Sequence, residues 1–171
     1  DANDLDNFQR CWQIKISHLE SAALWEYMQD FQERMERFNN NGTILAEFLA
    51  EHFAVDFVYH PSLSTNSSYA EAKKLLKGNG GVVSFTLKDE SENALKKFYD
   101  REFSSIIKAP SIGSNLTLIC PYTLLTNYFY TDEELKEINL PRYLIRISAG
   151  CETETERILE DLDFALKRTI Y

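Results

Sequence analysis

The sequence lacks any long apolar segment and is poor in basic residues. No run approaches the roughly 20 apolar residues that a membrane-spanning helix needs, and the first residues show no signal-peptide pattern. Only 18 Lys and Arg stand against 27 Asp and Glu, which gives a formal net charge of −9 at pH 7. Because such a chain repels phosphate backbones and anionic lipid, we expect it to bind neither nucleic acid nor membrane.

Cysteine and histidine are also scarce. Cys11, Cys120 and Cys151 are odd in number, widely spaced and without a Cys-x-x-Cys pair, which argues against a disulfide framework and a zinc site. The three histidines lie on separate predicted elements without the spacing of metal ligands. We therefore expect no metal site and a reducing, cytoplasmic compartment.

No complete set of catalytic residues can be recognised by spacing. The sequence has no Gly-x-Ser-x-Gly elbow and no argued pair of nucleophile and base. Gly78-Asn-Gly-Gly81 follows a predicted helix and enters a predicted strand, which reverses the order of a phosphate-binding loop. We therefore expect a turn there and no catalytic residue in this chain.

The apolar pattern, with 44% hydrophobic residues, predicts a layered α/β domain. From Leu24 to Phe38 apolar residues recur at steps of four and three, which predicts a helix with a core-facing stripe. Helical spacing resumes after Gly42, so either two helices meet there or one long helix tolerates this glycine. Further helices are predicted at residues 69–77 and after capping boxes at Asp89 and Thr153. Strands are predicted at residues 54–59, 82–87, 105–108, 116–120 and 143–148.

The connection between residues 107 and 116 is too short for a helical crossover. This length argues against a doubly wound parallel sheet. We expect a small mixed or antiparallel sheet with helices packed on it, preceded by a long helix.

Arg146 is the most informative residue, because a charged guanidinium in an apolar strand needs an anionic partner. In a strand, Leu144, Arg146 and Ser148 share one face, and Tyr143, Ile145 and Ile147 share the other. Two partners are possible. Either an Asp or Glu of the fold pairs with Arg146, or a ligand carboxylate accepts two parallel hydrogen bonds from it. In the loop of residues 109–115, Ser111 and Gly113 offer a hydroxyl and backbone N–H groups. Together with Arg146, this loop would form a two-point carboxylate clamp.

Several motifs occur together in a recognisable order. They are Met35-Glu-Arg-Phe-Asn39, Ala46-Glu-Phe-Leu49, Val58-Tyr-His-Pro-Ser-Leu63, Lys77-Gly-Asn-Gly-Gly-Val-Val-Ser-Phe85, Ala109-Pro-Ser-Ile-Gly113 and Leu144-Ile-Arg-Ile-Ser-Ala-Gly150. Over about residues 24–166 the chain resembles the C-terminal part of the Cys/Met-metabolism family of pyridoxal-phosphate enzymes. The segment of residues 108–125 most resembles fungal cystathionine gamma-synthases.

The resemblance implies a fold-type-I enzyme in which a separate large domain binds pyridoxal 5'-phosphate on a lysine. It implies that residues 1–18 connect to a missing N-terminal cofactor domain and that residues 19–171 form the C-terminal substrate-binding domain. Arg146 would hold the α-carboxylate of the substrate, with Ser111 beside it. The full-length homo-oligomeric transferase would replace the acyl group of an O-acylhomoserine with cysteine and give cystathionine, a step of methionine biosynthesis by transsulfuration.

The sequence departs from the family pattern at two points. No lysine has the family's small-residue Ser-x-x-Lys setting, and Lys15, between Ile14 and Ile16, is only the nearest by position; Asn127 stands where a histidine is common. We therefore expect the chain alone to bind no cofactor and to be inactive. The alternatives are a lyase of the same family and a non-catalytic interaction module. A missing partner domain would leave an apolar patch along Trp12, Leu24 and Trp25, which self-association would cover.

Overall fold

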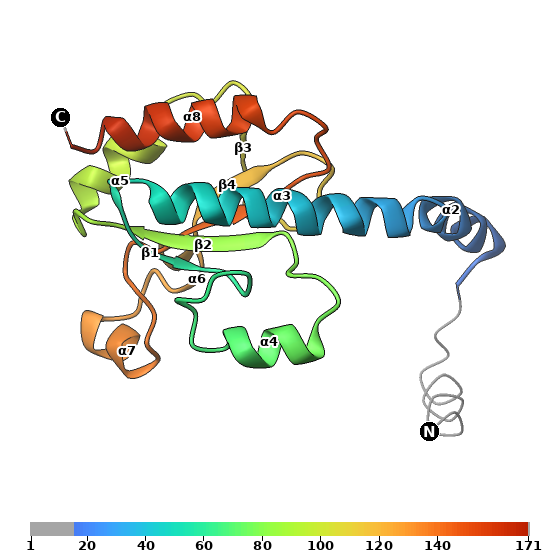
Figure 1. Ribbon diagram of the computed structural model, residues 1–171, viewed down its shortest axis with the longest axis horizontal. Coiled ribbons are helices and arrows are strands. Elements are labelled where there is room, and N and C mark those ends of the chain that lie inside the picture. Colours follow the sequence, from blue (N-terminus) through green and yellow to red (C-terminus); the bar gives the residue numbers. More distant parts are fainter. Residues whose placement is uncertain (1–15, 171) are drawn as a thin grey trace. The chain divides into compact units, whose positions relative to one another are not determined.

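A computed structural model describes residues 16–170 (Figure 1). The chain divides into two units, Asp1–Glu33 and Arg34–Tyr171. Among the described residues, no helix combines the length and the apolar character that crossing a membrane requires.

The first unit contains α2 (His18–Met28), which begins with a capping box. The Ser17 side chain accepts a hydrogen bond from the Glu20 N–H, and the Glu20 carboxylate accepts one from the Ser17 N–H. No residue of α2 is buried. Leu24 and Trp25 are 52% and 70% exposed, so the predicted apolar patch is confirmed at these two positions and the core-facing stripe is wrong. Trp12 and Lys15 lie outside the described residues, and self-association stays a prediction.

Helix α3 (Phe31–Glu51) runs through Gly42 without a break. The two helices therefore meet at Gln29 and Asp30 instead of at Gly42. Gly42 is required for packing: a Cβ atom there would overlap the carbonyl oxygen of Gly80 and lie 2.9 Å from the Cα of Gly81. The helix thus lies against the turn that leads into the next strand.

Five strands form one mixed sheet in the order β1-β2-β5-β4-β3. Strand β2 pairs antiparallel with β1 and β5, β5 pairs antiparallel with β4, and β3 pairs parallel with β4. The mixed sheet is confirmed. Because β3 has only two residues, an irregular loop suffices to join it to its parallel neighbour. The strands are β1 (Val55–Tyr59), β2 (Val82–Leu87), β3 (Ile107–Lys108), β4 (Leu118–Pro121) and β5 (Ile145–Ser148).

Two short helices were not predicted, and two predicted capping boxes are wrong. Ser91, not Asp89, caps α5 by accepting from the Ala94 N–H at 3.1 Å. Thr155 is the N-cap of α8 and makes no side-chain capping bond. The remaining helices are α4 (Tyr69–Leu75), α5 (Glu92–Tyr99), α6 (Tyr122–Thr126), α7 (Asp132–Glu137) and α8 (Glu156–Lys167); α6 and α7 are the additional ones.

The hydrophobic core lies on one face of the sheet. In the second unit, α3, α5 and α8 lie over that face, and α4, α6 and α7 lie on the other side (Figure 1). Strand residues that alternate along β2 and β5 are fully buried against these helices; the core includes Val83, Phe85, Ile145, Ile147, Leu45, Leu49, Phe98, Leu162 and Leu166. The residues between them therefore point to the opposite face of the sheet.

His60 joins the end of β1 to the turn before β2. It is 1% exposed, its Nδ1 lies 2.7 Å from the Ser62 hydroxyl, and its Nε2 lies 3.3 Å from the Gly80 carbonyl oxygen. Burial lowers the pKa of His60 below its usual value. His60 thus has a structural role, and no group of three His, Cys, Asp or Glu side chains among residues 16–170 is placed to hold a metal ion.

Substituting Gly42 tests the close approach of α3 to the turn. In an unobstructed helix, Gly→Ala raises stability by about 1 kcal/mol. Because the added methyl group would overlap the Gly80 carbonyl, we expect Gly42→Ala to lower the free energy of unfolding by about 1 to 3 kcal/mol in urea denaturation. Asn40→Ala, at an exposed position of the same helix, is the control and should raise it by up to about 0.7 kcal/mol through helix propensity alone. A Gly42→Ala protein as stable as the parent would contradict the packing.

Candidate carboxylate-binding site

Arg146 lies on the central strand of the sheet, on the face opposite the core. Its neighbours in sequence, Ile145 and Ile147, are fully buried. Its cross-strand partners are Ser84 on β2 and Cys120 on β4. Because directly opposed residues share a face, the guanidinium projects between a hydroxyl and a thiol. The alternation predicted along this strand is confirmed.

The guanidinium of Arg146 is bonded to a loop and to no carboxylate. Its Nη2 donates to the carbonyl oxygen of Pro110 at 2.5 Å and to that of Ser111 at 3.2 Å. The ring centre of Tyr122 lies 5.1 Å from the guanidinium carbon, within the range of a cation–π contact. Within residues 16–170 no Asp or Glu forms an ion pair with Arg146. The alternative of an acidic partner from the fold is therefore wrong for the described chain.

The donors of Arg146 are only partly used. Its Nε is buried and has no hydrogen-bond partner among the described residues. A buried donor without a partner costs about 1 to 3 kcal/mol, and more for a charged group. Carbonyl oxygens carry only partial charge, so the positive charge is not neutralised by the loop. An anion that approaches this face would share the guanidinium with the two carbonyls.

The loop of residues 109–117 is fastened to β5 at a second point. The Gly113 N–H donates to the Ser148 hydroxyl at 3.3 Å, and Ser148 is 3% exposed. Gly113 has a φ of 74°, a left-handed conformation that glycine adopts without strain. Ser148 follows Arg146 by two positions and shares its face of the strand. The structure thus brings Ser111 beside Arg146, although the bonded group of Ser111 is its carbonyl and not its hydroxyl.

Glu152 fixes the far end of the same loop. Its carboxylate accepts from the backbone N–H of Thr117 and, at 3.0 Å, from the Thr117 hydroxyl. The same hydroxyl accepts from the Gly150 N–H at 2.9 Å, and the Asn41 side chain on α3 donates to the carbonyls of Gly150 and Glu152, each at 3.0 Å. Charge-assisted bonds of this kind are among the strong ones in proteins. Glu152 therefore positions the loop.

Cys120 and Asn127 do not complete a catalytic set. Cys120 is 1% exposed; burial raises the pKa of its thiol, and the nearby Arg146 offsets this only in part. A protonated buried thiol is a poor nucleophile. The Asn127 amide oxygen accepts from the Thr126 hydroxyl at 2.6 Å, a local contact within the chain segment that ends α6.

The lysine beside the loop is not placed as a cofactor lysine would be. The lysine nearest in sequence to the loop, Lys108, has its ammonium 4.8 Å from the ring centre of Tyr99 and 5.9 Å from that of Phe103. It is thus engaged with aromatic rings. Ser105 stands three positions before it, but the two residues between them are isoleucines instead of small residues. We derive no chemical step through this cofactor within the chain.

Sequence reasoning missed Tyr122, Ser148 and Glu152. Tyr122 lies in the segment of residues 108–125, but its sequence position does not predict its cation–π contact with Arg146. That contact depends on how α6 returns toward β5. Ser148 was placed on the correct face without a partner. Glu152 gave no local signal, since its bond to Thr117 spans 35 positions.

Comparisons with known proteins agree on one family. The sequence pattern described as "Cys/Met metabolism PLP-dependent enzyme" matches residues 4–167. An L-methionine gamma-lyase of Fusobacterium nucleatum is 34% identical over 141 residues, covering 82% of this chain and 35% of that protein. The cystathionine gamma-synthase of Neurospora crassa is 36% identical over 131 residues, covering 76% of this chain and 20% of that protein.

A solved structure has the same fold. The cystathionine gamma synthase from Xanthomonas oryzae pv. oryzae, in complex with cystathionine, superposes with a TM-score of 0.82 at 28% identity, covering 94% of this chain and 41% of that one. The chain thus spans between one fifth and about two fifths of the length of these relatives.

Substituting Glu152 tests whether it holds the loop. Glu152→Gln removes the charge that strengthens both bonds to Thr117, and we expect the free energy of unfolding to fall by about 1.5 to 3 kcal/mol. Glu154→Gln is the matched control, because Glu154 is exposed and its only ion pair within residues 16–170, to Arg157, is 3.9 Å long; its effect should stay within about 0.5 kcal/mol. Equal effects of the two substitutions in urea denaturation would refute the role of Glu152.

Proposed function

The chain belongs to the Cys/Met metabolism family of PLP-dependent enzymes, and we propose that it is the substrate-binding part of such an enzyme. Residues 19–171 form its C-terminal domain, and residues 1–18 connect it to a cofactor domain. The proposal is supported by the resemblance to longer proteins, of which the matching segments cover only 35% and 20%. Cofactor-dependent chemistry then requires both domains, and the isolated chain is inactive.

Arg146 binds the α-carboxylate of an amino-acid substrate. The observation that carries this assignment is a guanidinium at the centre of the sheet that, within the described residues, contacts two loop carbonyls and no carboxylate. A charge-assisted bond to a substrate carboxylate would provide the missing anion. Ser111 lies at the rim of the site, and the bond between Gly113 and Ser148 holds the loop in place.

The reaction is the γ-replacement of an O-acylhomoserine by cysteine, which gives cystathionine. The fungal cystathionine gamma-synthase among the relatives and the superposed synthase structure support this choice. Pyridoxal phosphate in the full-length cytoplasmic enzyme supplies the electron sink. This chain's residues orient the substrate by its carboxylate, and the full-length enzyme is a homo-oligomer.

A lyase of the same family is the second candidate. Methionine gamma-lyases and cystathionine beta-lyases are as similar to the chain as the synthase. All these reactions begin with an amino acid whose carboxylate must be held, so the assignment of Arg146 is the same in both cases. Product analysis of the full-length enzyme with an O-acylhomoserine and cysteine separates them: cystathionine marks the synthase, and a keto acid with ammonia marks the lyase.

Removing the guanidinium tests the assignment. In the full-length enzyme we expect Arg146→Ala to lower kcat/KM by an amount equivalent to about 2 to 5 kcal/mol, the usual loss when one member of a hydrogen-bonded charge pair is cut. Arg146→Lys should recover part of this loss, because lysine keeps the positive charge but cannot donate two parallel hydrogen bonds to one carboxylate. Ser111→Ala should cost only about 1 kcal/mol. Steady-state kinetics with unchanged KM and kcat/KM for Arg146→Ala would reject the assignment.

A further inference from the structure

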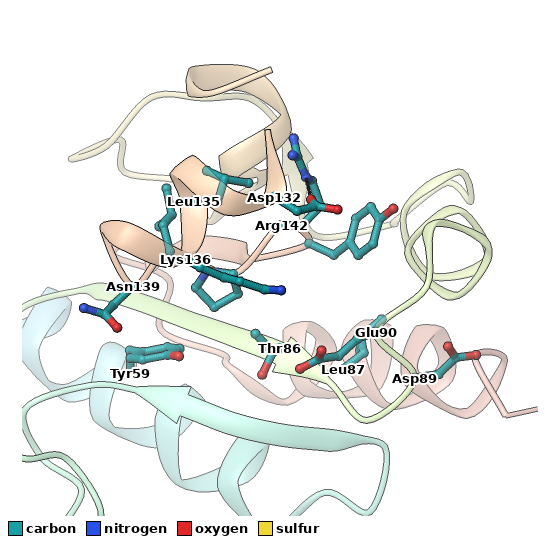
Figure 2. Close-up of a pocket in the computed structure, with 13 residues that line it drawn as sticks. Tyr59, Thr86, Leu87, Asp89, Glu90, Asp132, Leu135, Lys136, Asn139 and Arg142 are labelled. Atoms are coloured by element: carbon teal, nitrogen blue, oxygen red, sulfur yellow. Dashed lines mark hydrogen bonds and ion pairs between the residues drawn. The ribbon is translucent and has the colours of Figure 1, made fainter. Parts of the chain in front are cut away.

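A hollow lies between the end of β2 and α7 (Figure 2). Its volume is about 690 Å³, which is in the range of small-molecule sites. Its walls come from β1, β2, the loop before α5, α7 and the segment that leads to β5. Neither Arg146 nor Ser111 lines it. It is therefore a separate site from the carboxylate clamp.

Thr86 presents an unused hydroxyl to this hollow. The residue lines the hollow and is only 5% exposed. Within residues 16–170 its side chain makes no hydrogen bond. The oxygen itself is not fully enclosed, so it is open to a partner in the hollow. A polar group of a bound molecule would supply the missing partner.

Opposite charges stand on two sides of the hollow. Lys136 extends from α7 toward the side where Glu90 and Asp89 lie, in the loop after β2 (Figure 2). None of the three forms an ion pair within the described part of the chain. Arg142 differs, because its Nε lies 2.8 Å from Asp132 and its Nη2 donates to the Tyr130 carbonyl. Among the described residues, the hollow thus has one cationic and two anionic side chains that form no ion pair.

The remaining wall is largely apolar. It includes the Tyr59 ring, Leu135, Leu140 and Pro141. Burial, Asp56 and Glu90 all raise the pKa of Tyr59, so its hydroxyl remains a neutral donor at pH 7. A ligand that fits these surroundings has an apolar body and carries both signs of charge.

We propose that this hollow binds a small zwitterion with an apolar side chain, of the α-amino-acid class. The ammonium group contacts Glu90, with Asp89 adding negative charge nearby; the carboxylate contacts Lys136, and the Thr86 hydroxyl completes the polar contacts. A simple amine would leave Lys136 without a partner. A simple carboxylate would meet the repulsion of two acidic side chains. The site goes beyond the proposed function and does not depend on it.

The test is an NMR titration of the isotope-labelled chain with three probes of one shape: L-leucine, 3-methylbutylamine and 4-methylpentanoate. We expect leucine at pH 7 to shift amide signals of residues 86–90 and 132–143 saturably. Each single-charge probe should bind at least about threefold more weakly, since an exposed ion pair contributes up to about 1 kcal/mol. The titration is repeated with Arg146→Ala, in which these shifts should persist.

Variants locate the contacts. Lys136→Gln, Glu90→Gln and Thr86→Val should each weaken leucine binding about threefold to fivefold, whereas Lys97→Gln, at an exposed position outside the hollow, should not. Lys136 and Glu90 are exposed, so their variants keep the test decisive if Thr86→Val does not fold. The proposal is overturned by leucine shifts absent from the hollow, by equal binding of the three probes, or by unchanged affinity in Lys136→Gln. If the carboxylate-binding role of Arg146 were wrong instead, Arg146→Ala would leave kcat/KM of the full-length enzyme unchanged.

Discussion

A guanidinium at the centre of the sheet, bonded to two loop carbonyls, is the interaction on which the proposed site depends. Arg146 sits on the strand that is paired on both sides, so the register with β2 and β4 fixes its position. The opposite face of this strand is filled by the helical core. One face of the sheet therefore packs against the helices, and the other carries the guanidinium. The two carbonyl oxygens have only partial negative charge, so they do not neutralise Arg146 and a ligand anion can still pair with it.

The loop beneath this guanidinium is held from several directions. Ser148 holds its middle, Glu152 holds its end through Thr117, and Asn41 links the same segment to α3. These contacts join a helix, a strand exit and a loop that are far apart in sequence. A disturbance of Glu152 is therefore transmitted to the loop beside Arg146, even though Glu152 touches no proposed ligand.

The sequence predicted the sheet class, the bounds of β2 and the face of Arg146, because period-two alternation is strong there. It could not show what covers an apolar stripe, so Leu24 was assigned to a core and is exposed. Helices α6 and α7 have five and six residues, too few for periodicity to emerge. The cap at Ser91 was missed because a neighbouring acid offered a similar pattern. The partnership of Glu152 with Thr117 depends on the folded chain and has no local signal.

The most direct test of the account observes the guanidinium itself. In an NMR titration of the chain with propionate, the Nε–H signal of Arg146 reports whether a carboxylate docks on it. The account predicts a saturable shift of this signal together with the amides of Ser111 and Gly113. No shift at Arg146, or an equal shift at Arg142, which already has Asp132 as its partner, would contradict a dedicated carboxylate site.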